Sequence, residues 1–217
     1  MNARAIVLAA VRNALDGSGV PTPEPSPRAY RIGGAVAARS ADAVDLFVDR
    51  LEDYRATVVR TTSADLPAAV AAALRDVASV VVPAGLDPSW VHTARAAGVE
   101  VQVDDSTAPR THAELDAVEA VLTSSRVAIA ETGTIVLDGQ PDQGRRVLTL
   151  LPDRHVCVVA ASQVVGSVPE AVRLLAPHPD RPLTWISGPS ATSDIELVRV
   201  EGVHGPRDLR VLVVRDA

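Results

Sequence analysis

The chain has 217 residues, of which 47% are hydrophobic and 22% are charged, and its formal net charge is −6 at pH 7. These values are typical of a globular protein with one domain, or with one domain and a small appendage. The acidic balance argues against nucleic acid and anionic membranes as partners, and the apolar runs are too short for a membrane span.

The N-terminal region combines a predicted helix with a segment rich in proline and glycine. Apolar residues recur at helical spacing over Ala5–Leu15, and two glycines, Gly17 and Gly19, end the helix. The segment that follows cannot bury a core of its own, because it contains Pro21, Pro23, Pro25 and Pro27. We therefore expect residues 1–36 to form a helical arm with an irregular strap, and residues 37–217 to form a single domain.

The same N-terminal stretch does not resemble an export signal. Arg12 and Asn13 interrupt its apolar residues, and no small-residue cleavage site follows. The sequence therefore predicts a cytoplasmic protein.

Helices alternate with strands over residues 40–103. The apolar residues from Val44 to Tyr54 recur every three or four positions, which predicts a helix with one apolar stripe. Beyond it, short β-branched runs predict strands at Thr57–Val59, Ser79–Val82 and Val99–Val103, and helices are predicted over 63–74, with Ser63 as the N-cap, and over 87–98. Strands separated by helices predict βαβ units and a mostly parallel sheet with helices on both faces.

The second half of the domain has closely spaced strands. Strand candidates occur at Ala117–Leu122, Val127–Ala130, Thr134–Leu137, His155–Val159, Leu183–Ile186 and Leu209–Val214. The second and third of these are separated by a short turn that contains Gly133, which predicts an antiparallel hairpin. Helical spacing over 143–150 and 168–175 predicts two further helices. The order as a whole predicts an α/β domain with an antiparallel addition.

Several kinds of site are excluded by what the sequence lacks. With one cysteine and no lysine, the chain has no internal disulfide, no iron–sulfur cluster bound by three or four thiolates, no Schiff-base lysine and no Walker A loop. Neither a dinucleotide-binding G-x-G-x-x-G after a strand nor a G-x-S-x-G elbow is present. The five histidines have no paired metal-ligand spacing, so we expect no metal site, and the alternative is a zinc or non-haem iron site assembled from distant parts of the chain.

Two polar segments near the predicted hairpin are candidate site residues. Glu131, followed by Thr132 and Gly133, caps an apolar strand, where a carboxylate acts as a nucleophile or general base if burial raises its pKa. A turn carboxylate that accepts backbone N–H bonds is the structural alternative. Arg145 and Arg146 offer planar forks for a carboxylate or phosphate, and a solvated helix face explains them equally well.

Two loops near the C-terminus are further candidates. The loop after the strand at 183–186 offers N–H and hydroxyl donors for an anion from Gly188, Ser190, Thr192, Ser193 and Asp194. Ser193 and Glu196 have capping-box spacing, so plain helix capping is the alternative. His204 lies in a tight loop between glycines. His155 points to the same face of its strand as Cys157, and we interpret Cys157 as a buried packing residue.

Five segments together resemble the lactate utilization C branch of the LUD-domain family. They are Ala128–Leu137, Gly144–Arg146, Pro152–Val158, Trp185–Glu196 and Glu201–Pro206. The resemblance implies a fold like that of the NagB/RpiA/CoA-transferase group and a role as one of three proteins that oxidise L-lactate to pyruvate. It also implies that iron–sulfur clusters belong to the two partner proteins and that this chain binds no cofactor itself. The family assigns no catalytic role to any single residue.

Three hypotheses about function stay open at this point. In the first, the chain is a substrate-handling or accessory subunit whose cleft binds a small carboxylate or phosphorylated ligand, with Arg145 or Arg146 holding the anion. In that cleft a histidine, His155 or His204, handles a proton, and Glu131 lies in the same cleft. The second is a CoA- or acyl-transferring enzyme with Glu131 as its nucleophile. The third is a purely structural subunit that docks the iron–sulfur partners through the N-terminal arm.

Overall fold

The computed structural model describes residues 2–18, 24, 31–192, 200–201 and 205–215, and the chain forms two compact units, Met1–Tyr30 and Arg31–Ala217. The first unit contains helix α1 (Ala3–Gly17), which confirms the predicted N-terminal helix. Asn2 caps this helix, its Oδ1 accepting the Ala5 N–H at 2.9 Å. None of the α1 residues is buried within the unit.

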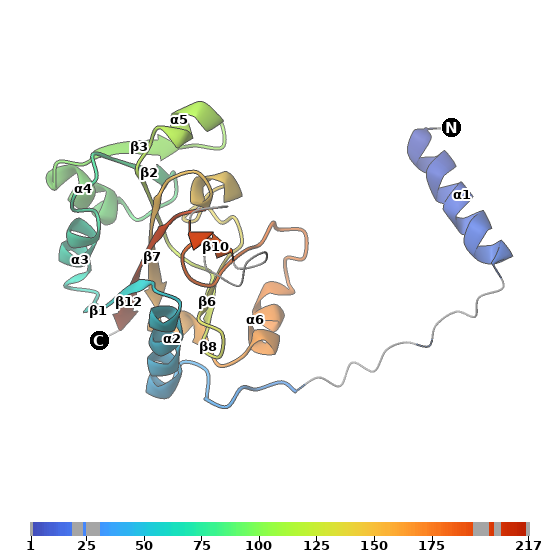
Figure 1. The fold of residues 1–217 in the computed structure, drawn as a ribbon, viewed down its shortest axis with the longest axis horizontal. Helices are drawn as coiled ribbons and strands as arrows, with labels where there is room; N and C mark the ends of the chain where they lie inside the picture. The colour runs from blue at the N-terminus through green and yellow to red at the C-terminus, as the bar shows by residue number, and fades with distance from the viewer. Residues whose placement is uncertain (1, 19–23, 25–30, 193–199, 202–204, 216–217) are drawn as a thin grey trace. The chain divides into compact units, whose positions relative to one another are not determined.

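The centre of the second unit is a six-stranded parallel sheet with the order β1-β12-β7-β4-β2-β3 (Figure 1). The strands are β1 (Thr57–Thr62), β2 (Ser79–Pro83), β3 (Glu100–Asp104), β4 (Ala120–Thr123), β7 (Arg154–Ala160) and β12 (Asp208–Arg215). The C-terminal strand β12 is inserted between β1 and β7, so the first and last strands of this sheet lie side by side at one edge of it. This sheet confirms the predicted α/β class and its parallel strands.

Because side chains alternate along each strand, the two faces of this sheet pack into two different hydrophobic cores. On β12, Leu209, Val211 and Val213 enter one core, while Leu212 and Val214 enter the other. The second core packs against α3 (Leu66–Ala73) and α4 (Pro88–Ala96). The sheet is therefore covered on both faces, as continuous β-branched strands require.

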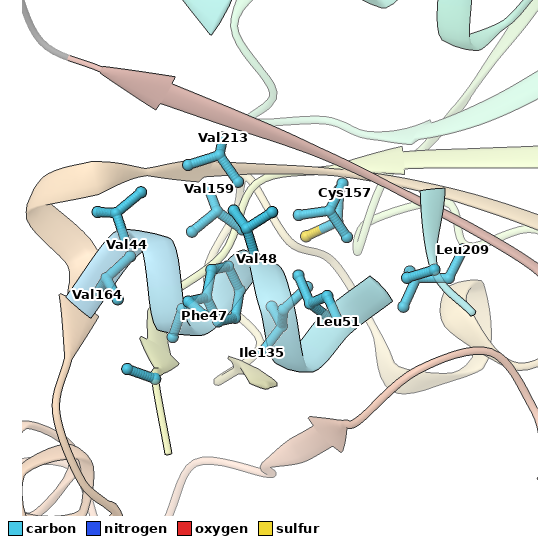
Figure 2. Close-up of a cluster of buried hydrophobic side chains, with 14 of the residues drawn as sticks. Val44, Phe47, Val48, Leu51, Ile135, Cys157, Val159, Val164, Leu209 and Val213 are labelled. Atoms are coloured by element: carbon cyan, nitrogen blue, oxygen red, sulfur yellow. The ribbon is translucent and has the colours of Figure 1, made fainter. Parts of the chain in front are cut away.

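Helix α2 (Ala41–Asp53) supplies five of the sixteen buried residues of the first core. Ser40 caps it by accepting the Ala43 N–H, and its stripe of Val44, Phe47, Val48 and Leu51 is buried. Figure 2 shows this stripe, with Val48 beside Val159 and Val213 of the parallel sheet and Leu51 near Ile135 of the second sheet. The amphipathic spacing in the sequence thus leads directly to the packing of α2 between two sheets.

The second sheet has four strands in the order β8-β5-β6-β9. These strands are β5 (Val127–Ile129), β6 (Thr134–Leu137), β8 (Val164–Val165) and β9 (Thr184–Ile186). The β5–β6 pair is the predicted antiparallel hairpin, but it belongs to a mixed sheet, because β8 pairs with β5 in parallel. The outer face of this sheet packs against α6 (Val168–Leu175), which has the predicted bounds.

Three local elements differ from the prediction. The segment predicted as a helix over 143–150 contains only the 3-10 turn η1 (Arg146–Thr149), because Gly144 has φ +72° and Arg145 is extended. Helix α3 begins after Asp65 rather than Ser63. Helix α5 (His112–Asp116) is too short to show periodicity, and only its capping box of Thr111 and Glu114 marks it in the sequence.

Two short strands, β10 (Ala191–Thr192) and β11 (Val200–Glu201), pair antiparallel after β9. The helix start expected at Ser193 and Glu196 lies outside the described residues.

Candidate functional site

A cavity of about 550 Å³ lies at the amino-terminal ends of β7 and β12. Its walls include His155 of β7 and Leu209 of β12, which are partners in the register of these strands. The remaining walls come from η1, from β9 with the loop that follows it, and from residues 205–206. Four of the predicted site residues line this cavity: Arg146, His155, Gly188 and Ser190.

His155 forms the inner wall of the cavity as a buried, uncharged ring. Its Nε2 lies 2.8 Å from the hydroxyl of Thr123 on β4, and its Nδ1 is buried with no hydrogen-bond partner in the described part of the chain. Burial lowers the pKa of His155 from 6.5 to about 4. Thr123 was not predicted, although a polar residue at the end of an apolar strand is a signal for such a partner.

Below His155, the thiol of Cys157 completes a small polar cluster. The Thr123 hydroxyl lies 3.8 Å from the Cys157 Sγ, and this sulfur lies 3.7 Å from the carbonyl oxygen of Ser124. Burial raises the pKa of Cys157 to about 12, so the thiol is protonated at neutral pH and does not act as a nucleophile.

Protonation of His155 should oppose folding. Between the folded pKa of about 4 and the unfolded value of 6.5, the unfolded chain binds a proton that the folded chain does not. We therefore expect the free energy of unfolding to fall by about 2 kcal/mol from about pH 7 to about pH 5. Urea denaturation at the two pH values measures this loss, and a His155→Gln variant should lack it. The same loss in both proteins would show that another group is responsible.

Arg146 is the cationic group of the cavity. Its side chain is exposed and has no salt-bridge or hydrogen-bond partner among the described residues, so it can receive an anion. The hydroxyl of Thr149 donates to the Arg146 carbonyl at 3.0 Å and fixes the η1 turn. Across the cavity, the Ser190 N–H donates to the Pro206 carbonyl at 2.8 Å, which holds the loop after β9 in place.

Arg145 lies outside this cavity and has a different partner. Its Nε and Nη2 donate to both carboxylate oxygens of Asp104 at 2.9 and 2.6 Å, and its Nη2 also donates to the Arg110 carbonyl. Burial alone would raise the pKa of Asp104, but the Arg145 guanidinium and the Arg110 backbone N–H together lower it. Arg145 therefore joins η1 to the end of β3.

Glu131 also lies outside the cavity. Its Oε1 accepts from the Arg31 guanidinium at 3.1 Å and from the Ala35 N–H at 3.3 Å. The carboxylate therefore anchors the segment that leads into α2. This arrangement matches the structural alternative considered from the sequence, in which a turn carboxylate accepts backbone N–H bonds.

A line of hydroxyls connects the hairpin turn with the cavity. Thr132 Oγ1 lies 2.7 Å from Thr134 Oγ1, which lies 2.7 Å from Ser187 Oγ in the cavity wall. Gly133 and Gly188 both pack closely on the end of α2, since a Cβ at either would lie 2.7 Å from a side-chain carbon of Arg50 or Tyr54. These two glycines therefore set the position of the loops around the cavity.

The structure describes one of the four remaining predicted site residues. Thr192 is in β10, and Ser193, Asp194 and His204 lie outside the described residues.

The described residues contain no cluster of three or more His, Cys, Asp or Glu side chains that could hold a metal ion. None of the helices in that same part of the chain is both long and apolar enough to cross a membrane.

Comparisons with known proteins agree on one family. A model of the LUD domain matches residues 44–214. A Deinococcus radiodurans protein described as lactate utilization protein C is 52% identical over 176 residues, 80% of each chain. The Bacillus subtilis protein of that description is 35% identical over 101 residues, 44% of this chain and 42% of that one. A crystal structure of a DUF162 family protein from D. radiodurans has a TM-score of 0.67 at 42% identity and covers 82% of this chain and 99% of its own.

Proposed function

The chain belongs to the LUD-domain family, and we propose that it is the substrate-handling subunit of a three-protein system that oxidises L-lactate to pyruvate. Its relatives described as lactate utilization protein C support the link to lactate. Oxidation of lactate releases two electrons, and with one cysteine this chain cannot ligate an iron–sulfur cluster in the usual way. The proposal therefore assigns electron transfer to two iron–sulfur partner proteins.

The observation that carries this proposal is the cavity with Arg146 on its wall. A guanidinium with no partner in the described chain is suited to a carboxylate, and the hydroxyls of Thr149 and Ser187 lie in the same wall. The uncharged ring of His155 at the base adds no second positive charge. We propose that Arg146 binds the carboxylate of a small hydroxy or keto acid, and that Gly188, Ser190 and Thr192 position the loop opposite it.

Calorimetry with the full-length protein tests this assignment. L-lactate or pyruvate should give saturable heat, and Arg146→Gln should weaken binding about tenfold, because one charge-assisted hydrogen bond contributes roughly 1.5–3 kcal/mol. Arg173→Gln, which removes an exposed charge on α6, is the matched control and should bind like the wild type. No heat with either acid would contradict the proposal.

A structural role for the N-terminal arm is a second candidate. It is favoured by α1, where Ile6, Val7, Leu8, Val11 and Leu15 are all at least 40% exposed. Residues Arg31–Ala217 form a compact unit of their own, so deletion of residues 1–30 tests the role without removing the domain. Co-purification with the iron–sulfur partners should then be lost, and its persistence would exclude this role.

Acyl transfer through Glu131 has less support. Its carboxylate is bound by Arg31 and Ala35 and does not line the cavity, so a thioester would have to displace these contacts. Mass spectrometry after incubation with an acyl-CoA decides the question, because a covalent adduct on Glu131 is required.

We propose that the domain is of the NagB/RpiA/CoA-transferase type and extends over residues 37–217, with residues 1–36 as the arm. The two-sheet α/β architecture and the family membership support this description.

A further inference from the structure

A second cavity, of about 410 Å³, lies near the carboxyl ends of β1 and β12, whereas the first cavity lies at the amino-terminal ends of β7 and β12. Three arginines line it: Arg39 just before α2, Arg60 on β1, and Arg215 at the last position of β12. The other polar residues of its wall are Ser40, Asp45 and Ser162. Carboxyl ends of parallel strands are the usual place for ligands in open α/β sheets.

Among the described residues that line this cavity, arginines outnumber acidic residues three to one. Arg60 forms a salt bridge with Asp45, the one acidic residue in the wall. Arg39 and Arg215 have no salt bridge or side-chain hydrogen bond with any residue that the structure describes. Two guanidiniums therefore face one cavity without a counter-charge from the described chain, in a protein whose formal net charge is −6.

The backbone around Arg39 is held in an uncommon conformation. Arg39 has φ +63°, in the left-handed region, and its N–H donates to the Val164 carbonyl of β8 at 2.8 Å. This bond fixes the chain just before Ser40, which caps α2, so the positive end of the helix dipole lies at the same cavity wall. The dipole adds to the field of the arginines and favours an anion further.

We propose that this cavity binds a phosphoryl dianion, with Arg39 and Arg215 as the residues that hold it. A phosphate group carries between one and two negative charges at neutral pH and accepts paired N–H bonds from guanidinium forks. Inorganic phosphate and the phosphate of a larger metabolite share this chemistry. The site is independent of the cavity that contains Arg146, since the two have no lining residue in common.

Calorimetric titration of the full-length protein with inorganic phosphate at low ionic strength tests the proposal. We expect one saturable site, with binding weakened about tenfold in Arg39→Gln and again in Arg215→Gln, and weakened by added salt. Arg95→Gln removes an exposed arginine on α4 that does not line the cavity, so this control should bind like the wild type. Adenosine monophosphate in a parallel arm distinguishes the sources, because tighter binding than phosphate would identify a larger metabolite.

Two results would overturn the proposal. One is the absence of saturable binding with both ligands in the millimolar range, and the other is equal weakening by Arg95→Gln, which would indicate a diffuse charge effect. Thermal melts check that each variant is folded, and because Arg39 and Arg215 are tested separately, failure of one variant to fold leaves the other as the test. Lactate binding by Arg39→Gln should match that of the wild type. The phosphate proposal and the carboxylate proposal at Arg146 can therefore be rejected separately.

Discussion

Replacing Arg145 with leucine is expected to lower the free energy of unfolding by about 3 kcal/mol. The carboxylate of Asp104 is only 2% exposed, and Arg145 supplies its two closest hydrogen bonds. Without this guanidinium, a buried negative charge loses its counter-ion, and the ligand cavity is not involved. Urea denaturation at neutral pH measures the loss.

The neighbouring arginine provides a matched control. Arg146→Leu removes the same charge one position later, where the structure describes no partner, so stability should change by less than about 0.5 kcal/mol. Adding Asp104→Asn to Arg145→Leu should restore part of the stability, because the buried charge is then gone. If Arg145→Leu left stability unchanged and abolished binding of lactate or pyruvate, Arg145 would be a substrate-binding residue and not a structural one.

The sequence alone could not show which of these adjacent arginines has a structural role. Both fit an anion site or a solvated face, because the pattern carries no information about a partner far along the chain. Asp104 lies 41 positions before Arg145, and it meets Arg145 only because β3 and η1 come together in the folded domain. The sequence identified both arginines as candidates, and the folded structure shows that one of them, Arg145, has Asp104 as a structural partner.

The order of the strands was equally hidden. The alternating pattern predicted parallel strands and most helices, because periodicity is a local property. That β12 lies between β1 and β7 depends on pairings such as Val211 with Cys157, which local patterns do not encode. The same holds for β9, which pairs with β6 across the intervening α6 and makes the predicted hairpin part of a larger sheet.

His155 shows an intermediate case. Strand alternation predicted that it shares a face with Cys157, and both contact the Thr123 hydroxyl. The sequence did not predict that this face is closed to solvent at His155, which keeps the ring uncharged. The face of β7 that carries Cys157 and Val159 packs against α2 and the second sheet, and neither could be placed against β7 from the pattern alone.

Gly133→Ala is expected to destabilise the domain by about 3 kcal/mol, which makes the glycine of the hairpin turn a structural requirement. Gly133 has φ +58°, and an added Cβ would lie 2.7 Å from the Arg50 Cβ and 3.0 Å from its carbonyl carbon. The α2 backbone cannot move away without disturbing its buried stripe. The expected cost therefore combines a left-handed backbone with a steric clash.

Gly98→Ala separates these two contributions. Gly98 also has a positive φ, +83°, but nothing lies within 4 Å of an added Cβ, so only the backbone cost of about 1 kcal/mol applies. The excess loss in Gly133→Ala, measured by urea denaturation of both variants, is then the contribution of the contact with α2. Equal losses would mean that the hairpin turn can move away from α2. The line of hydroxyls from Thr132 to Ser187 would then not hold the cavity wall in place, since it starts from that turn.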